Sequence, residues 1–121
     1  SEVATRSLSS LLREHGEGAC VEAVLLTCQG CELLAVEGAL EHIRAGMIRN
    51  FVWRVHSTRQ VAGATNNSRR IAEVLWDAGY NFYRLDSCRT DPGCVPEWME
   101  SLTDILEFVT RERDDHPDLL A

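Results

Sequence analysis

The stretch "LLTCQGCELLAVEGALEHIRAG", Leu25–Gly46, decides the fold of this chain. An apolar run ends in a Gln-Gly turn that is flanked by Cys28 and Cys31, and an amphipathic segment follows at once. In that segment, apolar residues recur at the three- and four-residue spacing of one helix face: Leu33, Val36, Leu40 and Ile43. The stretch therefore predicts a strand, a tight turn and a helix over 32–45.

The segments around this unit repeat the same alternation. Val21–Cys28 is apolar on consecutive positions from Ala23 to Leu26, which is typical of a strand covered on both faces in a parallel sheet. Further strands are predicted at 49–57, 81–86 and 119–121, and further helices at 1–15, 68–80 and 97–113. The pattern predicts one α/β domain over 1–121, with a mostly parallel, partial Rossmann-like sheet of three to four strands flanked by helices.

The composition narrows the classes of protein. The chain has 45% hydrophobic and 26% charged residues, which is typical of a folded, soluble domain. Its net charge of -7, with no basic stripe, makes nucleic acid an unfavourable partner. No apolar run approaches the roughly 20 residues of a transmembrane segment. Five cysteines are an odd number, which favours a reducing compartment such as the cytoplasm or an organelle interior.

The cysteines allow several interpretations. Cys28 and Cys31 form a C-x-x-C motif, which is either a redox pair or two small residues packed at the end of a strand. Together with Cys88 and Cys94 they would supply four zinc ligands, although the second spacing is longer than zinc motifs use. A Cys88–Cys94 disulfide is the other interpretation of the second pair.

Three segments together resemble one enzyme family: "VEAVLLTCQGCELLAVEGALEHIRAG", "FVWRVH" and "LWDAGYNFYRLD". The chain is similar, from about Ser7 to Ala121, to the C-terminal half of an FkbM-type methyltransferase. The most specific match is Gln29-Gly30 with Glu32, followed by Glu37–Ala39. The resemblance implies a Rossmann-like sheet and transfer of a methyl group from S-adenosylmethionine to a hydroxyl.

The matching motif is degenerate in this chain. Leu25-Leu26-Thr27 stands where the family pattern has Lys-Ile-Asp, so an ammonium and a carboxylate are lost at the carboxyl end of the strand. Leu8-Ser9 replaces a Leu-Asp pair, and Arg54 replaces a glutamate before His56, which reverses the charge there. The resemblance therefore implies that Thr27, Gln29, Gly30 and Arg54 are degenerate cofactor-binding positions.

The front half of the family domain has no counterpart in this sequence. In the family, the glycine-rich turn that holds the methyl donor and the acid that holds its ribose precede the matched segment. The first 20 residues contain no strand followed by such a turn. The chain is thus expected to lack the S-adenosylmethionine-binding half, to bind no cofactor and to have no catalytic residues.

Two functional hypotheses follow from these observations. The first is a non-catalytic, methyltransferase-like domain that acts as an interaction or structural subunit of a larger assembly. The alternative is a fragment or split half of an S-adenosylmethionine-dependent O-methyltransferase, with Glu32 and His56 as the catalytic groups. Without that chemistry, Glu32 is a first-turn acid and His56 is a histidine at the rim of a pocket.

The first hypothesis implies a protein partner. The strand at Val21–Cys28 would lose one neighbour with the absent half, and its edge would then be exposed. A second copy, a large partner or the helix over Ser1–His15 could cover that edge. Because the family occurs in bacteria and algae, an organellar assembly is among the options.

Overall fold

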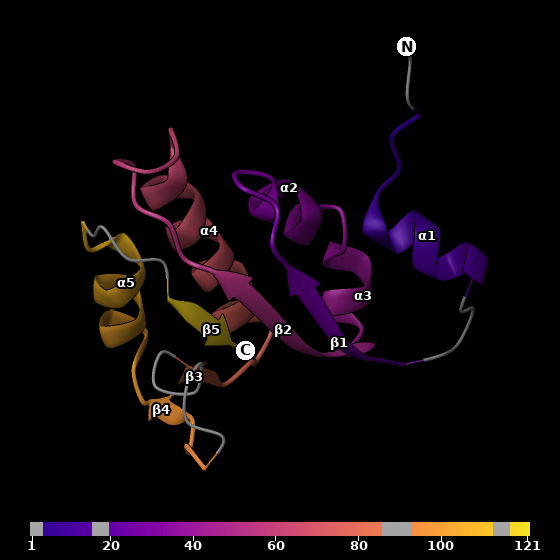
Figure 1. Cartoon of the computed structure of the whole chain (residues 1–121). Helices are drawn as coiled ribbons and strands as arrows, with labels where there is room; N and C mark the ends of the chain where they lie inside the picture. Colours follow the sequence, from indigo (N-terminus) through magenta and orange to yellow (C-terminus); the bar gives the residue numbers. More distant parts are fainter. Residues whose placement is uncertain (1–3, 16–19, 86–92, 113–116) are drawn as a thin grey trace.

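The protein forms a five-stranded sheet packed against helices, as seen in a computed structural model that describes residues 4–15, 20–85, 93–112 and 117–121 (Figure 1). Within these residues the helices are α1 (Leu8–His15), α2 (Glu32–Glu37), α3 (Leu40–Arg44), α4 (Ala64–Asp77) and α5 (Leu102–Thr110). The strands are β1 (Val21–Leu26), β2 (Ile48–Arg54), β3 (Phe82–Arg84), β4 (Glu97–Met99) and β5 (Asp118–Leu120). The predicted mixed α/β class is confirmed.

The directions of the strands differ from the predicted mostly parallel sheet. The order is β1-β2-β5-β3-β4, in which β1 and β2 are parallel and the other three pairs are antiparallel. The closing strand β5 inserts between β2 and β3, and β4 adds a fifth strand at the edge. Because β2 and β3 are both antiparallel to β5, they run in the same direction as each other and as β1.

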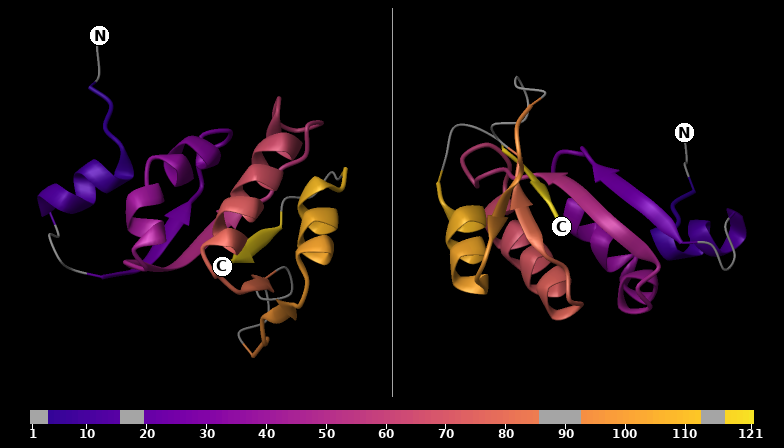
Figure 2. Two further views of the ribbon diagram at one scale, coloured as in Figure 1. Left: turned by 180° about the vertical axis from the view of Figure 1, so that it is seen from behind. Right: turned by 90° about the horizontal axis from the view of Figure 1, so that it is seen from below.

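The helices pack on one face of the sheet (Figure 2). Strand β2 shows the consequence for burial: Phe51, Trp53 and Val55 are buried on the helix side, and the alternate residues from Asn50 to Arg54 are part-exposed. The predicted burial of Ala23–Leu26 on both faces is wrong, since Ala23 and Leu25 are exposed. These two side chains face the side of the sheet that has no helix in the described part of the chain.

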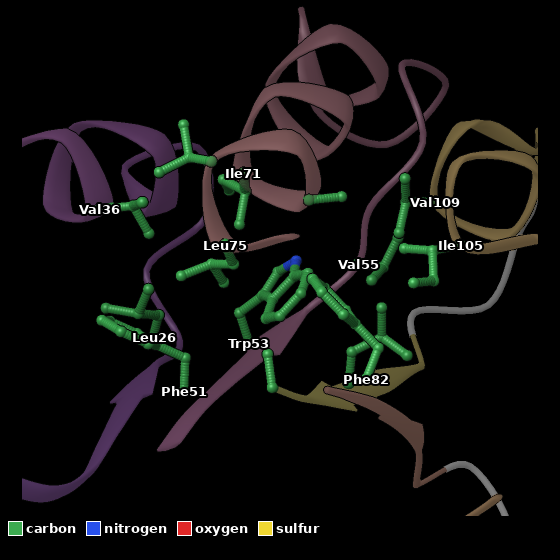
Figure 3. Packing of buried hydrophobic residues seen from close by; sticks show 14 of the residues in the cluster. Leu26, Val36, Phe51, Trp53, Val55, Ile71, Leu75, Phe82, Ile105 and Val109 are labelled. Carbon is green, nitrogen blue, oxygen red and sulfur yellow. The ribbon is translucent and has the colours of Figure 1, made fainter. Parts of the chain in front are cut away.

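The hydrophobic core lies between the sheet and α4 and α5 (Figure 3). Trp53 is at its centre, and its ring meets Phe82 edge-on with 5.9 Å between ring centroids. Residues from each surrounding element complete this core: Leu26, Val36, Phe51, Val55, Ile71, Leu75, Ile105 and Val109. Such edge-to-face aromatic contacts stabilise a core beyond the burial of their area.

The predicted single helix over 32–45 is two helices. The break falls at Gly38, where an added Cβ would lie 3.2 Å from the Leu34 carbonyl oxygen and 3.3 Å from Ser7 Cβ. The segment that leads into α1 approaches the backbone here, and the Ser9 N–H donates to the Gly38 carbonyl at 2.9 Å. Arg13 of α1 also forms an ion pair with Glu41 of α3. Helix α1 therefore packs against α2 and α3, outside the sheet.

The predicted helix over 97–113 begins later than expected. Residues 97–99 form β4, and α5 begins at Leu102 because the Ser101 hydroxyl caps it by accepting a hydrogen bond from the Asp104 N–H at 3.1 Å. Trp98, which the helical spacing placed in the core, is 58% exposed. Helix α4 also differs from the prediction, because it begins at Ala64, four residues before 68.

We expect Phe82→Ala to lower the free energy of unfolding by about 3–5 kcal/mol, because it opens a cavity against Trp53 in a site with no exposure. Trp98→Ala removes a larger, mostly exposed ring and should cost less than about 1 kcal/mol. Urea unfolding followed by circular dichroism measures both. Equal losses would contradict the position of the core.

Candidate functional site

A small polar cavity lies at the carboxyl ends of β1 and β2. The β1–α2 turn, the end of β2 and the first turns of α4 enclose it, and its lining residues are Gly30, Glu32, Trp53, Arg54, His56, Val61, Ala64, Asn67, Ser68 and Ile71. Its volume of about 10 Å³ has room for about one water molecule. Four residues selected from the sequence meet here: Gly30, Glu32, Arg54 and His56.

The turn between β1 and α2 is held by Glu32. The Gly30 N–H donates to Glu32 Oε2 at 2.9 Å, and the Glu32 side chain is only 6% exposed. Gly30 has φ +93°, a backbone conformation that favours glycine, and an added Cβ would lie 3.3 Å from Val61 Cγ1. Glu32 is therefore the first-turn acid of α2 that the sequence predicted, and its buried carboxylate also fixes the turn before the helix.

Two buried polar atoms in the cavity wall lack a hydrogen-bond partner among the described residues: Glu32 Oε1 and Trp53 Nε1. An ionised carboxylate oxygen accepts and an indole N–H donates, so one small group that both donates and accepts would satisfy the two. Water and a hydroxyl have that character and the right size. The cavity is thus suited to one hydroxyl-sized group.

The remaining selected residues lie at or near the cavity. His56 is buried and lines it, and also takes part in a further interaction. Arg54 bonds to Asp118 of β5, with 3.3 Å between Nε and Oδ1, so a carboxylate from the closing strand offsets its charge. Thr27 and Gln29 are exposed and are not among the lining residues.

Sequence analysis missed Trp53 as a member of this site. Its alternation with Phe51 and Val55 correctly indicated a core position, but that pattern carries no information about the indole N–H. A tryptophan in a core strand nonetheless needs a partner for that N–H. The chemical nature of the side chain, combined with its position at the end of β2, was the available signal.

Cys28 and Cys31 are joined by a disulfide, with 5.5 Å between their Cα atoms. Cys94 is also disulfide-bonded, Cys20 is an exposed free thiol, and Cys88 lies outside the described residues. The described residues contain no group of three or more His, Cys, Asp or Glu arranged to hold a metal ion. In this state Cys28 and Cys31 carry no thiolate for zinc.

A larger cleft, of about 400 Å³, lies at the opposite end of the sheet. Arg49, Asn50 and Tyr83 are among its lining residues, as is Tyr80, whose hydroxyl donates to the Ile48 carbonyl. Burial raises the pKa of the Tyr80 hydroxyl. The cleft contains no cluster of catalytic groups, so the polar cavity at the carboxyl ends is the stronger candidate site.

No protein-family model, curated protein or solved structure matches this chain. Among the described residues, no helix is both long enough and apolar enough to cross a membrane.

We expect Gly30→Ala to lower the free energy of unfolding by about 1 kcal/mol more than Gly79→Ala does. Both glycines have a left-handed backbone, with φ of +93° and +91°, but only the Gly30 site places a neighbour against the new Cβ. Urea unfolding of both variants measures the difference. Adding Val61→Ala to the Gly30→Ala variant should remove the extra loss in the free energy of unfolding. Equal losses in the two glycine variants would contradict the tight approach of Val61.

Proposed function

We propose that this chain is a non-catalytic, methyltransferase-like domain that serves as a structural or interaction subunit of a larger protein assembly. The positions at which this chain departs from the family motif support the absence of catalytic activity. The observation that carries the proposal is an apolar row on the face of the sheet that has no helix in the described part of the chain.

Strand register defines this apolar row. Leu25 lies opposite Val52, Val52 opposite Leu120, Leu120 opposite Tyr83, and Tyr83 opposite Trp98. Residues that lie opposite each other in neighbouring strands project from the same face of a sheet. Each of the five strands therefore contributes one large side chain to a continuous row across the whole sheet.

The apolar row is accessible at both ends. Leu25 is 67% exposed and Trp98 is 58% exposed. The solvated face of an antiparallel sheet usually carries polar side chains, and contiguous exposed apolar surface marks a site of protein contact. The helices of this chain already occupy the other face, where they bury Phe51 and Trp53.

The occupant that best fits this surface is a different α/β protein unit. Within the described residues β1 pairs only with β2, so its outer edge can receive a further strand while helices of the same partner cover the apolar row. This is the arrangement that the family resemblance assigns to the missing front half. Two copies would bring together net charges of -7 each, which disfavours a self-paired face.

The positions at which the chain departs from the family motif also support the proposal. Thr27 is exposed and bears no charge, and the Leu25 side chain belongs to the apolar row. Arg54 is engaged by Asp118. The strand end that should present an ammonium and a carboxylate presents apolar and compensated groups instead.

A photo-crosslinking amino acid at position 25 or 98 should give one adduct with a different protein chain in extracts of the source cells, whereas the same probe at position 34 should not. Leu34 is a matched control, because it is 71% exposed and lies on α2. The adduct mass is measured by mass spectrometry. An adduct of two copies of this chain, or equal labelling at position 34, would overturn the proposed occupant.

The purified partner then allows a second comparison. Leu25→Glu should weaken the complex at least about tenfold by burying a charge in an apolar contact, and Leu34→Glu should leave the affinity unchanged. Titration calorimetry measures both. Equal affinity of the two variants would exclude the apolar row as the contact surface.

The polar cavity favours a second candidate function, the half of an O-methyltransferase that receives the hydroxyl substrate. Glu32 and His56 would then lie beside the acceptor hydroxyl. A cavity with room for about one water cannot hold S-adenosylmethionine, and the described residues provide no glycine-rich turn for it after a strand. The methyl donor does not fit this chain, so any donor site would belong to another unit.

Calorimetric titration of the isolated chain with S-adenosylmethionine and S-adenosylhomocysteine separates the two functions. We expect no heat of binding at micromolar to millimolar ligand. Saturable binding that Glu32→Gln abolishes would restore the enzyme hypothesis.

A further inference from the structure

We propose that Cys28 and Cys31 form a redox-active pair: in the dithiol form the pair reduces a disulfide of a protein substrate and is itself oxidised to the Cys28–Cys31 disulfide. The proposed docking function does not use this C-x-x-C motif, whose disulfide can be reduced and re-formed. The inference does not depend on the apolar row or on the methyltransferase resemblance.

The position of the disulfide makes it accessible to a substrate. Both cysteines are half-buried in the turn between β1 and α2, and the neighbouring residues Thr27 and Gln29 are exposed. Thiol–disulfide exchange requires a thiolate to approach a sulfur from outside, which a fully buried pair would prevent.

The disulfide contributes little to holding the fold. It closes a loop of only four residues, and the stabilisation that a cross-link provides through chain entropy is smallest for the shortest loops. Hydrogen bonds already fix the same turn: the Gly30 N–H donates to Glu32 Oε2 at 2.9 Å, and the Ala35 N–H donates to the Cys31 carbonyl at 3.0 Å. The turn should therefore keep its shape when the disulfide is reduced.

A turn fixed in this way preorganises the two thiols. With 5.5 Å between the Cα atoms, Cys28 and Cys31 lie at the separation that a disulfide needs. Closing the disulfide is then an intramolecular step between groups already in place, which is faster than capture of a second molecule.

The exchange proceeds in two steps. In the reduced protein, one cysteine thiolate attacks a sulfur of the substrate disulfide, that S–S bond breaks, and the released substrate thiolate takes a proton from water. The second cysteine thiolate attacks the mixed disulfide, which forms the Cys28–Cys31 bond and releases the other substrate thiol. Two electrons pass from the cysteine pair to the substrate, and an external dithiol restores the reduced pair.

The test uses insulin as the protein disulfide and dithiothreitol as the dithiol. The full chain should accelerate the reduction of insulin at least about tenfold over dithiothreitol alone, as followed by precipitation of the freed chains. Cys28→Ser and Cys31→Ser should each abolish the acceleration. Cys20→Ser is the matched control and should retain it, since Cys20 is a free, exposed thiol outside the motif.

Alkylation and mass spectrometry provide an independent readout on the same samples. Cys28 and Cys31 should become alkylated together as dithiothreitol rises, while Cys20 is alkylated throughout and the far-ultraviolet circular dichroism stays constant. No acceleration by the unmodified chain would overturn the proposal. Persistence of activity in Cys28→Ser, or unfolding on reduction of the pair, would overturn it as well.

Discussion

The burial of one face of β2 is the constraint on which the rest of the structure depends. Phe51, Trp53 and Val55 point to the same side, and α4 and α5 close over them with Ile71, Leu75, Ile105 and Val109. When the large apolar side chains of a strand all point to one side, helices on that side alone can bury them. The position of α4 and α5 then fixes where β3 and β5 join the sheet, because Phe82 and Leu119 must reach the same core. The sheet is thus organised around a single layer of helices.

Within the described residues, the second face of the sheet has no helix over it. The apolar row crosses every strand, and the exposed side chains at its two ends, Leu25 and Trp98, are unfavourable in water. The free edge of β1 adds unpaired backbone groups along the same border. Docking of the proposed α/β partner would cover both features, whereas α1 contacts Gly38 and α3.

The sequence predicted the kinds of element better than their arrangement. The strands predicted at 49–57 and at the closing "LLA" correspond to β2 and β5, because both patterns are local. The insertion of β5 between β2 and β3 is a long-range pairing that no local pattern records. The break at Gly38 likewise depends on the approach of Ser7, and the position of Trp98 depends on a cap at Ser101 and on pairing with Tyr83. For the site, the family resemblance selected Gly30, Glu32 and His56, whereas the structure alone adds Trp53 to them.

The geometry of the turn shows which residues can distinguish an enzyme from a scaffold in this fold. Gly30 and Glu32 are each required by the backbone: one supplies a left-handed residue beside Val61, and the other buries a carboxylate to hold its N–H. Their presence therefore follows from folding alone and is not evidence of chemistry. Thr27 and Arg54 carry no such requirement, since one is solvent-exposed and the other is held by a partly exposed ion pair. An enzyme with this fold could keep acidic residues at these two positions with little loss of stability. Under the proposed family resemblance, the absence of acids at these two positions is therefore the observation that supports the proposed scaffold.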